Sequence, residues 1–274
     1  MKLRYLGTAA YEGIPSLFCQ CELCKKAREL GGRNLRSRSQ ALVNDDLLID
    51  FPPDTSLHYM KYNFDWMKIE NCLITHSHSD HLYVEDMEQA RTDYSHDYQM
   101  RLHYYADRSG YRKMKKVFGR WYMKPVSEVH LLTLGEIFKV GHYDVMAVRA
   151  DHARSTSPVV YAISDGEKKM LYCHDSGFLS EKSLKQLQKF GKFDLLSLDC
   201  TGGLQKGWVH HHMCLETNVL LVEKLKELGM ADDHTICISN HFSHNGQSTY
   251  EELVEEASKH HFLISYDGME VEFS

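Results

Sequence analysis

The chain has 274 residues, of which 43% are hydrophobic, so it can bury a sizeable core in one large domain or two small ones. We expect a single domain over residues 1–274, because no linker rich in proline or glycine interrupts the sequence. The formal net charge of −6 argues against a nucleic acid as the main partner, and the N-terminal MKLRYLG lacks the apolar run of a signal peptide.

The first half of the chain alternates short apolar runs with loops. A short helix is predicted at residues 21–31, where Gly31-Gly32 ends it. Asn44-Asp45-Asp46 and Asp165-Gly166 are turn signals, so each predicts a hairpin between the apolar runs on either side. The predicted strands of this half cover residues 3–7, 41–50, 71–76, 101–106, 129–134, 143–150, 159–164 and 169–174.

From residue 180 the pattern changes to an alternation of strands and helices. The helices are predicted at residues 180–190, 213–229 and 248–260, with Ser180 and Ser248 as N-caps. The strands are predicted at residues 193–200, 234–241 and 269–274. Many strands followed by strand–helix alternation predict a layered α/β domain.

Residues 91–125 stand out because they are basic and rich in tyrosine. The simpler interpretation is a solvated insertion whose long side chains cover neighbouring surface. The alternative is a lid-like segment or a surface that faces an anionic substrate.

The strongest signal in the chain is the run THSHSDHL at residues 75–82, directly after a predicted strand. In extended chain His76 and His78 project to the same side, so they can hold one metal ion. Asp80 and His81 then point elsewhere, which suits a second ion nearby. A lone histidine is usually structural, but four metal-competent side chains within six positions favour a metal site.

Three later strand ends offer further ligands. His152, Asp175 and His241 each follow a predicted strand, where all three can converge on one rim of a pair of sheets. Each is a weak signal alone, because a neighbour of suitable chemistry competes with it. The competing residues are Asp151, His174 and His244.

Cys19, Cys21 and Cys24 lie within six positions and are one ligand short of a tetrahedral structural zinc site. Reactive thiols or a redox pair are the alternatives. The other five cysteines lie in apolar segments, which predicts buried thiols and a reducing, cytoplasmic setting. The five are Cys72, Cys173, Cys200, Cys214 and Cys237.

No stretch has the ~20 apolar residues that span a bilayer, so no membrane partner is expected.

The run THSHSDH resembles the HxHxDH motif of the metallo-β-lactamase superfamily, and the later candidates match the remaining ligand positions in order. This resemblance covers most of the chain and implies an α/β fold, the four-layer αββα metallo-β-lactamase sandwich. It also implies two active-site divalent metal ions, and such ligands suit Zn, Mn, Fe or Ni. The implied ligands are His76, His78 and His152 for one ion, Asp80, His81 and His241 for the other, and Asp175 as a bridge.

The loop GTAAYEGIP before CQCELC and the ending SYDGME are similar to the phosphodiesterase accessory protein of the carbon–phosphorus lyase pathway. That resemblance implies hydrolysis of a small phosphorylated substrate, most readily a phosphodiester, by a hydroxide that bridges two metals. It implies that Asp80 and His212 are the catalytic residues, with His212 as general acid rather than His210 or His211. It further implies a homodimer, and one structural Zn held by Cys19, Cys21, Cys24 and His244.

Other functions stay open on the sequence. Another hydrolase of the superfamily, such as a nuclease or a thioester or ester hydrolase, uses similar ligands. The alternative from a different class is a non-hydrolytic biosynthetic factor, because the N-terminal stretch also resembles the pyrroloquinoline quinone biosynthesis protein B family. Residues 91–125 are bulkier and more basic than the phosphodiesterase family predicts, which leaves the natural substrate open.

Overall fold

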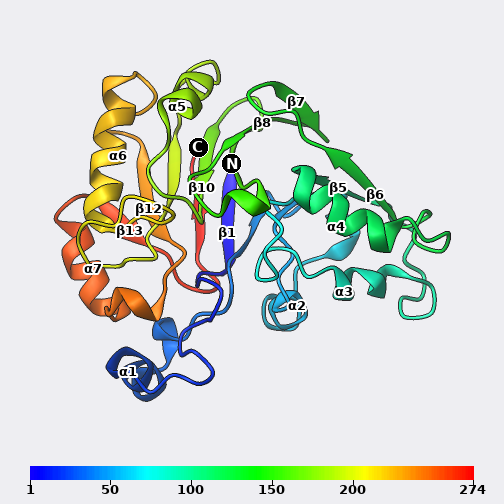
Figure 1. Cartoon of the computed structure of the whole chain (residues 1–274), viewed down its shortest axis with the longest axis horizontal. Coiled ribbons are helices and arrows are strands. Elements are labelled where there is room, and N and C mark those ends of the chain that lie inside the picture. The colour runs from blue at the N-terminus through cyan, green and yellow to red at the C-terminus, as the bar shows by residue number, and fades with distance from the viewer.

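The computed structural model describes residues 1–274 and contains two seven-stranded sheets (Figure 1). The first sheet is mixed: the four strands between residues 47 and 131 run parallel to one another, and the other strand pairs are antiparallel. In spatial order it consists of β14 (Glu270–Glu272), β1 (Lys2–Gly7), β2 (Gln40–Val43), β3 (Leu47–Ile49), β4 (Asn71–Leu73), β5 (Leu102–Ala106) and β6 (Ser127–Leu131).

The second sheet contains a parallel half and an antiparallel half. In spatial order it consists of β13 (Phe262–Ile264), β12 (Ile236–Asn240), β11 (Leu195–Asp199), β10 (Lys169–Cys173), β9 (Val159–Ser164), β8 (Tyr143–Arg149) and β7 (Ile137–Val140). Strands β10, β11, β12 and β13 run parallel to one another. Strands β7, β8, β9 and β10 each pair antiparallel with the next. The parallel strands therefore end at a common edge, where the loops that follow them meet.

Helices cover the outer face of each sheet, so the molecule has four layers (Figure 1). On the first sheet these are α2 (Thr55–Tyr62), α3 (Val84–Met87) and α4 (Arg108–Phe118). On the second they are α5 (Glu181–Leu187), α6 (Leu215–Glu227) and α7 (Tyr250–Ser258). Helix α1 (Glu22–Leu30) lies apart from both sheets, at the lower end of the view in Figure 1.

The period-two alternation of side chains explains the layering. In β8, Val145 and Ala147 point into the apolar core between the sheets, whereas Met146 and Val148 point into the core beneath the helices of the second sheet. A third apolar core, which includes Met114 of α4, lies between the first sheet and its helices. Three apolar layers between four structural layers are what the predicted αββα sandwich requires, and that prediction is confirmed.

Local details also agree with the sequence. The turn at Asn44-Asp45 has positive φ at both residues and joins β2 to β3, and the turn at Asp165-Gly166 joins β9 to β10. Ser180 accepts a hydrogen bond from the backbone N–H of Ser183, as an N-cap does. All five cysteines predicted to be buried are buried.

Some predicted boundaries are wrong. The N-cap of α7 is Thr249 and not Ser248, because Thr249 and Glu252 form a reciprocal capping box. The pattern also gave no indication of α2, α4, β7 or β13. In α4 the apolar side chains that pack on the core are Tyr111, Met114, Val117 and Phe118, and basic residues interrupt them in the sequence RSGYRKMKKVF.

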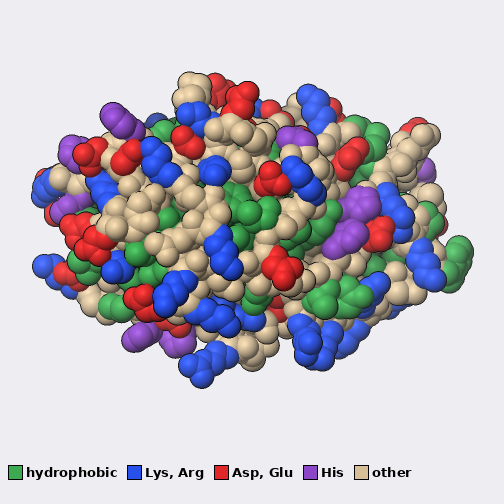
Figure 2. All heavy atoms as spheres, turned by 90° about the horizontal axis from the view of Figure 1, so that it is seen from above, with side chains coloured by type: hydrophobic (Ala, Val, Ile, Leu, Met, Phe, Trp, Pro, Cys, Tyr) green, Lys and Arg blue, Asp and Glu red, His purple; other side chains and the backbone are tan.

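The segment 91–125 is built on the first sheet. Its strand β5 lies between β4 and β6, so residues 102–106 belong to the sheet, while an insertion or lid on either side of them stays a prediction. Seen from above, acidic and basic side chains are interspersed over the molecule (Figure 2). No helix is both long enough and apolar enough to cross a membrane.

Candidate metal centre

The predicted ligands lie together at the edge where the parallel strands end. His76, His78, Asp80 and His81 follow β4, His152 follows β8, Asp175 follows β10 and His241 follows β12. Two of these positions, Asp175 and His241, have left-handed backbone conformations, with φ of 51° and 63°. Left-handed φ is uncommon outside glycine and costs free energy, so it persists where the surrounding fold imposes it, often at functional sites.

Four of these side chains form a first group around Asp175. His76 Nε2 lies 2.8 Å from His78 Nδ1 and 3.0 Å from Asp175 Oδ2. His152 Nε2 lies 3.3 Å from the same nitrogen of His78. One ligand atom from each of the four residues lies within 4.8 Å of the others, a spacing that one metal ion can occupy.

A second group shares Asp175. His81 Nε2 lies 3.2 Å from Asp80 Oδ2 and 3.3 Å from Asp175 Oδ2. His241 completes the group, and all four residues are buried. The structure thus brings all seven residues together as two groups that have Asp175 in common, and their roles as ligands stay a proposal.

Unsatisfied polar atoms indicate that the residues fit a cation. Four buried atoms here have no hydrogen-bond partner: Asp80 Oδ1, His81 Nε2, Asp175 Oδ1 and His241 Nε2. An unpaired buried polar atom costs about 1–3 kcal/mol, so four in one place need a partner. Imidazole nitrogens and carboxylate oxygens that converge in this way are the ligands that divalent transition metals take.

Carboxylates behind the site orient two of the imidazoles, and the sequence analysis missed both. Asp50 follows β3, and its Oδ2 lies 2.7 Å from His81 Nδ1. Asp199 ends β11, and its Oδ2 lies 3.2 Å from His241 Nδ1. Each contact fixes one ring nitrogen and leaves the other directed at the metal groups. The available signal was an acidic residue at the end of an apolar strand, as in LLID and LLSLD.

The charges of the site reinforce one another. Burial lowers the pKa of His81, but the carboxylates of Asp80 and Asp50 outweigh burial and raise it well above its ordinary value. Burial opposes ionisation of Asp175, yet the imidazoles of His241 and His76 hold its pKa well below its ordinary value. The buried carboxylates therefore remain charged and favour a cation between them.

His212 lies beside both groups. Its Nδ1 is 3.2 Å from Asp175 Oδ1 and 3.3 Å from Asp199 Oδ2. Burial lowers the pKa of His212, but these carboxylates, Asp199 first, raise it to about 9. His210 instead is exposed and pairs with Asp151, and neither residue belongs to a metal group.

The metal groups open into a hollow of about 420 Å³. Tyr11 and Trp208 contribute aromatic walls to it, and His212 lines it together with the ligands. A separate hollow of about 520 Å³ beside Trp66 is lined by no predicted ligand, so we place the substrate in the first one.

The three clustered cysteines lie next to His244. Its Nδ1 is 3.3 Å from Cys19 Sγ and 3.5 Å from Cys21 Sγ, and Cys24 completes a group of four ligand atoms within 4.8 Å. All three thiols are free, with no disulfide. His244 is three residues after His241, so a zinc ion here would tie the N-terminal loop to the loop of the metal centre.

We predict that Cys24→Ser removes one zinc equivalent and lowers the free energy of unfolding by about 3–4 kcal/mol when free zinc is 100–1,000 times its dissociation constant. Metal analysis and denaturant unfolding measure the two effects. Gln20→Ser is the control, because Gln20 is exposed and lies between Cys19 and Cys21, and it should change neither. Unchanged zinc content in Cys24→Ser would show that the cysteines do not hold a metal.

The chain is similar in sequence to several known proteins. The sequence model described as Beta-lactamase superfamily domain matches residues 48–231. A ribonuclease Z of Thermococcus onnurineus is 24% identical over 183 residues, which are 64% of this chain and 58% of that protein. A ribonuclease Z of Thermococcus kodakarensis is 26% identical over 149 residues, 52% of this chain and 47% of that protein. The chain thus spans about half the length of these curated relatives.

Solved structures agree on the fold. A diphosphatase from the PhnP family superimposes with a TM-score of 0.76 at 22% identity, covering 100% of this chain and 98% of that one. Zn²⁺-bound PqqB of Methylobacterium extorquens gives 0.77 at 17% identity and covers 100% of both chains. The short form of human tRNase Z gives 0.65 at 17% identity and covers 99% of both. Because the family model matches more than half of the sequence and the two sheets have its architecture, the chain belongs to the metallo-β-lactamase superfamily.

Proposed function

We propose that this protein is a metal-dependent hydrolase that cleaves phosphodiesters. The observation that carries the proposal is the position of Asp175, which is shared by two groups of ligands and has His212 beside it. Two adjacent cation sites with a titratable side chain at their rim suit the displacement of an alcohol from phosphorus.

Seven residues would hold the two ions. His76, His78 and His152 would bind one ion, and Asp80, His81 and His241 would bind the other. Asp175 would bind both. Two divalent ions bound there would supply an activated water and would neutralise charge on the phosphoryl oxygens.

His212 is the proposed general acid. Asp199 holds its Nδ1 by a hydrogen bond, so Nε2 is the nitrogen left to donate a proton to the leaving oxygen.

The names of similar proteins support a phosphate substrate. Two of them are ribonucleases and one is a diphosphatase, and both names denote cleavage at a phosphate. A hollow of about 420 Å³ with aromatic walls at Tyr11 and Trp208 suits a small diester. With a net charge of −6, we favour a small diester over a polynucleotide as the substrate.

Metal depletion and reconstitution test the proposal. The wild-type protein is stripped with a chelator, reloaded separately with Zn²⁺, Mn²⁺, Fe²⁺ or Ni²⁺, and assayed with bis(p-nitrophenyl) phosphate. We expect three metal equivalents per chain, two of them required for release of p-nitrophenol. The absence of diester turnover with every ion would contradict the proposal and favour a non-hydrolytic biosynthetic factor.

A further inference from the structure

A smaller hollow, of about 310 Å³, lies outside the metal centre and has an unusual lining. Every residue that lines it is a serine, an arginine or a lysine, and none is apolar, aromatic or acidic. Three segments far apart in the sequence form it: the loop after β4, helix α4, and the loop that contains residues 154–157. The lining residues are Ser77, Arg108, Ser109, Arg112, Lys113, Lys116, Ser155 and Ser157.

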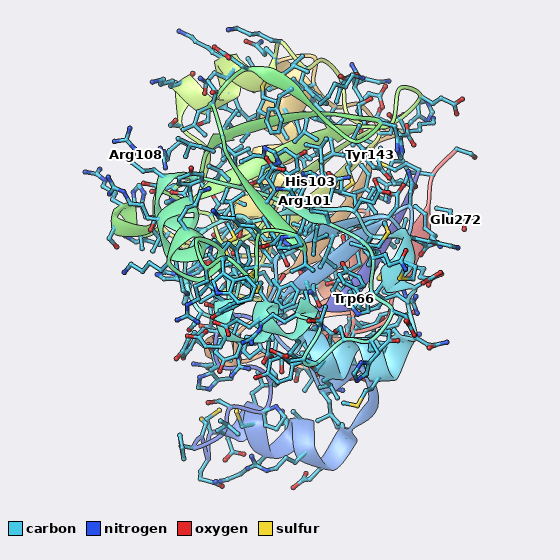
Figure 3. All side chains as sticks on the ribbon, turned by 90° about the vertical axis from the view of Figure 1, so that its right-hand side faces the viewer. Trp66, Arg101, His103, Arg108, Tyr143 and Glu272 are labelled. Atoms are coloured by element: carbon cyan, nitrogen blue, oxygen red, sulfur yellow. The ribbon has the colours of Figure 1, made fainter.

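The cations of this hollow have no acidic partner. Arg108, Arg112 and Lys116 form no ion pair, although basic residues elsewhere in the same segment do, such as Arg120 with Glu88. Arg108 extends outward from the start of α4 (Figure 3). Like charges gathered without counter-charges repel one another, and a bound anion relieves that repulsion. A local cationic surface on a chain of net charge −6 therefore indicates a specific anionic ligand.

The hollow is joined to the metal centre through Ser77, which lies between the predicted ligands His76 and His78. Ser77 Oγ and Ser109 Oγ of α4 are 2.7 Å apart. Lys113 Nζ donates hydrogen bonds to the carbonyl oxygens of Ser77 at 3.1 Å and Leu82 at 2.6 Å. Lys113 therefore holds the ligand loop in place and is not free for a ligand.

A further hollow, of about 660 Å³, shares lining residues with this hollow and with that of the metal centre. His152 lines both it and the metal-centre hollow, and Ser157 lines both it and the Ser-Arg-Lys hollow. Arg149 and Arg154 add two cations to this further hollow and form no ion pair, and the one carboxylate there, Asp151, pairs with His210. A ligand bound at the metal centre can thus extend over a continuous polar surface to α4.

The lining chemistry selects the ligand class. Guanidinium and ammonium groups with serine hydroxyls bind phosphate oxygens through charge-assisted hydrogen bonds. A nucleobase or acyl chain would need an apolar or aromatic wall, and the hollow has none. We propose that the Ser-Arg-Lys hollow binds a second phosphate group of the diester substrate, so that the preferred substrate carries a phosphate beyond the scissile one. This inference rests on the proposed phosphodiesterase function.

The test compares matched dinucleotides that differ only in a terminal phosphate. Wild-type protein should cleave a dinucleotide with a 5′- or 3′-terminal phosphate about tenfold to 100-fold more efficiently, in kcat/KM, than the same dinucleotide without one. The double variant Arg112→Gln, Lys116→Gln should lose most of that preference through KM. It should keep the wild-type rate on the unphosphorylated dinucleotide and on bis(p-nitrophenyl) phosphate.

Lys115→Gln is the matched control, because Lys115 lies on the same helix and is exposed but does not line the hollow. It should retain the preference of the wild type. A wild type that gains nothing from a terminal phosphate, and nothing from the next phosphate of a trinucleotide, would overturn the inference. So would an equal loss on all substrates in the double variant, because that result would assign the cations to structure.

Two further measurements separate the sources of the phosphate and the two levels of the proposal. A trinucleotide without terminal phosphate tests whether the next phosphate of a chain can replace a terminal one, and a gain with either substrate supports the inference. If the wild type cleaves no diester, the proposed function fails. Calorimetric binding of the phosphorylated dinucleotide then decides alone: tighter binding to wild type than to Arg112→Gln, Lys116→Gln supports the hollow, and equal binding refutes it.

Discussion

The Asp175→Ala variant is expected to lose both active-site ions and to hydrolyse phosphodiesters at least about 10³-fold more slowly than the wild type. Asp175 is the one residue common to the two ligand groups, and its carboxylate lies within 3.0–3.3 Å of His76 and His81. Its removal takes a negative charge from both cation sites and leaves buried imidazoles facing one another. Metal analysis together with initial rates on bis(p-nitrophenyl) phosphate measures the effect.

Two controls make this result specific. Asp151→Ala removes a carboxylate from another strand end that pairs with His210 and belongs to neither group, so metal content should stay at the wild-type level. The Asp175→Ala variant should also retain one zinc equivalent at the three clustered cysteines. These lie near the N-terminus, and their group shares no ligand with Asp175. Two active-site equivalents retained in Asp175→Ala would show that this residue does not bridge the ions.

The positions of the candidate ligands were predictable because each follows an apolar strand. Strands whose carboxyl ends meet at a sheet edge bring the residues after them together, whatever their separation in sequence. The choice between neighbours was less secure, and side-chain contacts now explain it. His174 points toward Ser197 and Asn240 and is satisfied there, whereas Asp175 turns toward the imidazoles.

Other parts of the site depend on contacts that no sequence pattern contains. Asp50 is 31 residues from His81, and Asp199 is 42 residues from His241, so their pairing requires the order of strands in each sheet. The Ser-Arg-Lys hollow likewise combines Ser77, Arg112 and Ser155 from three separate segments. The sequence showed that residues 91–125 are basic, but helix α4 was needed to direct those charges to one place.

The His212→Ala variant is expected to keep its metal ions and to lose about 10²–10⁴-fold in kcat on a diester with an alkoxide leaving group. An alkoxide is a strong base and needs a proton as it leaves, which His212 Nε2 would donate. On bis(p-nitrophenyl) phosphate the loss should be much smaller, because p-nitrophenolate leaves without protonation. The measurement is the ratio of rates on the two substrates, with metal content determined in parallel.

The same variant decides between two roles for His212. Asp175, Asp199, His212 and His241 also form a group whose ligand atoms lie within 4.8 Å of one another, so His212 competes with the other residues as a metal ligand. Loss of one metal equivalent, with similar rate losses on both substrates, would make it a ligand. His210→Ala is the control, because this exposed neighbour pairs with Asp151 outside the metal groups and should change neither metal content nor rate. A dependence on the leaving group with metal content intact is the result that a general acid alone produces.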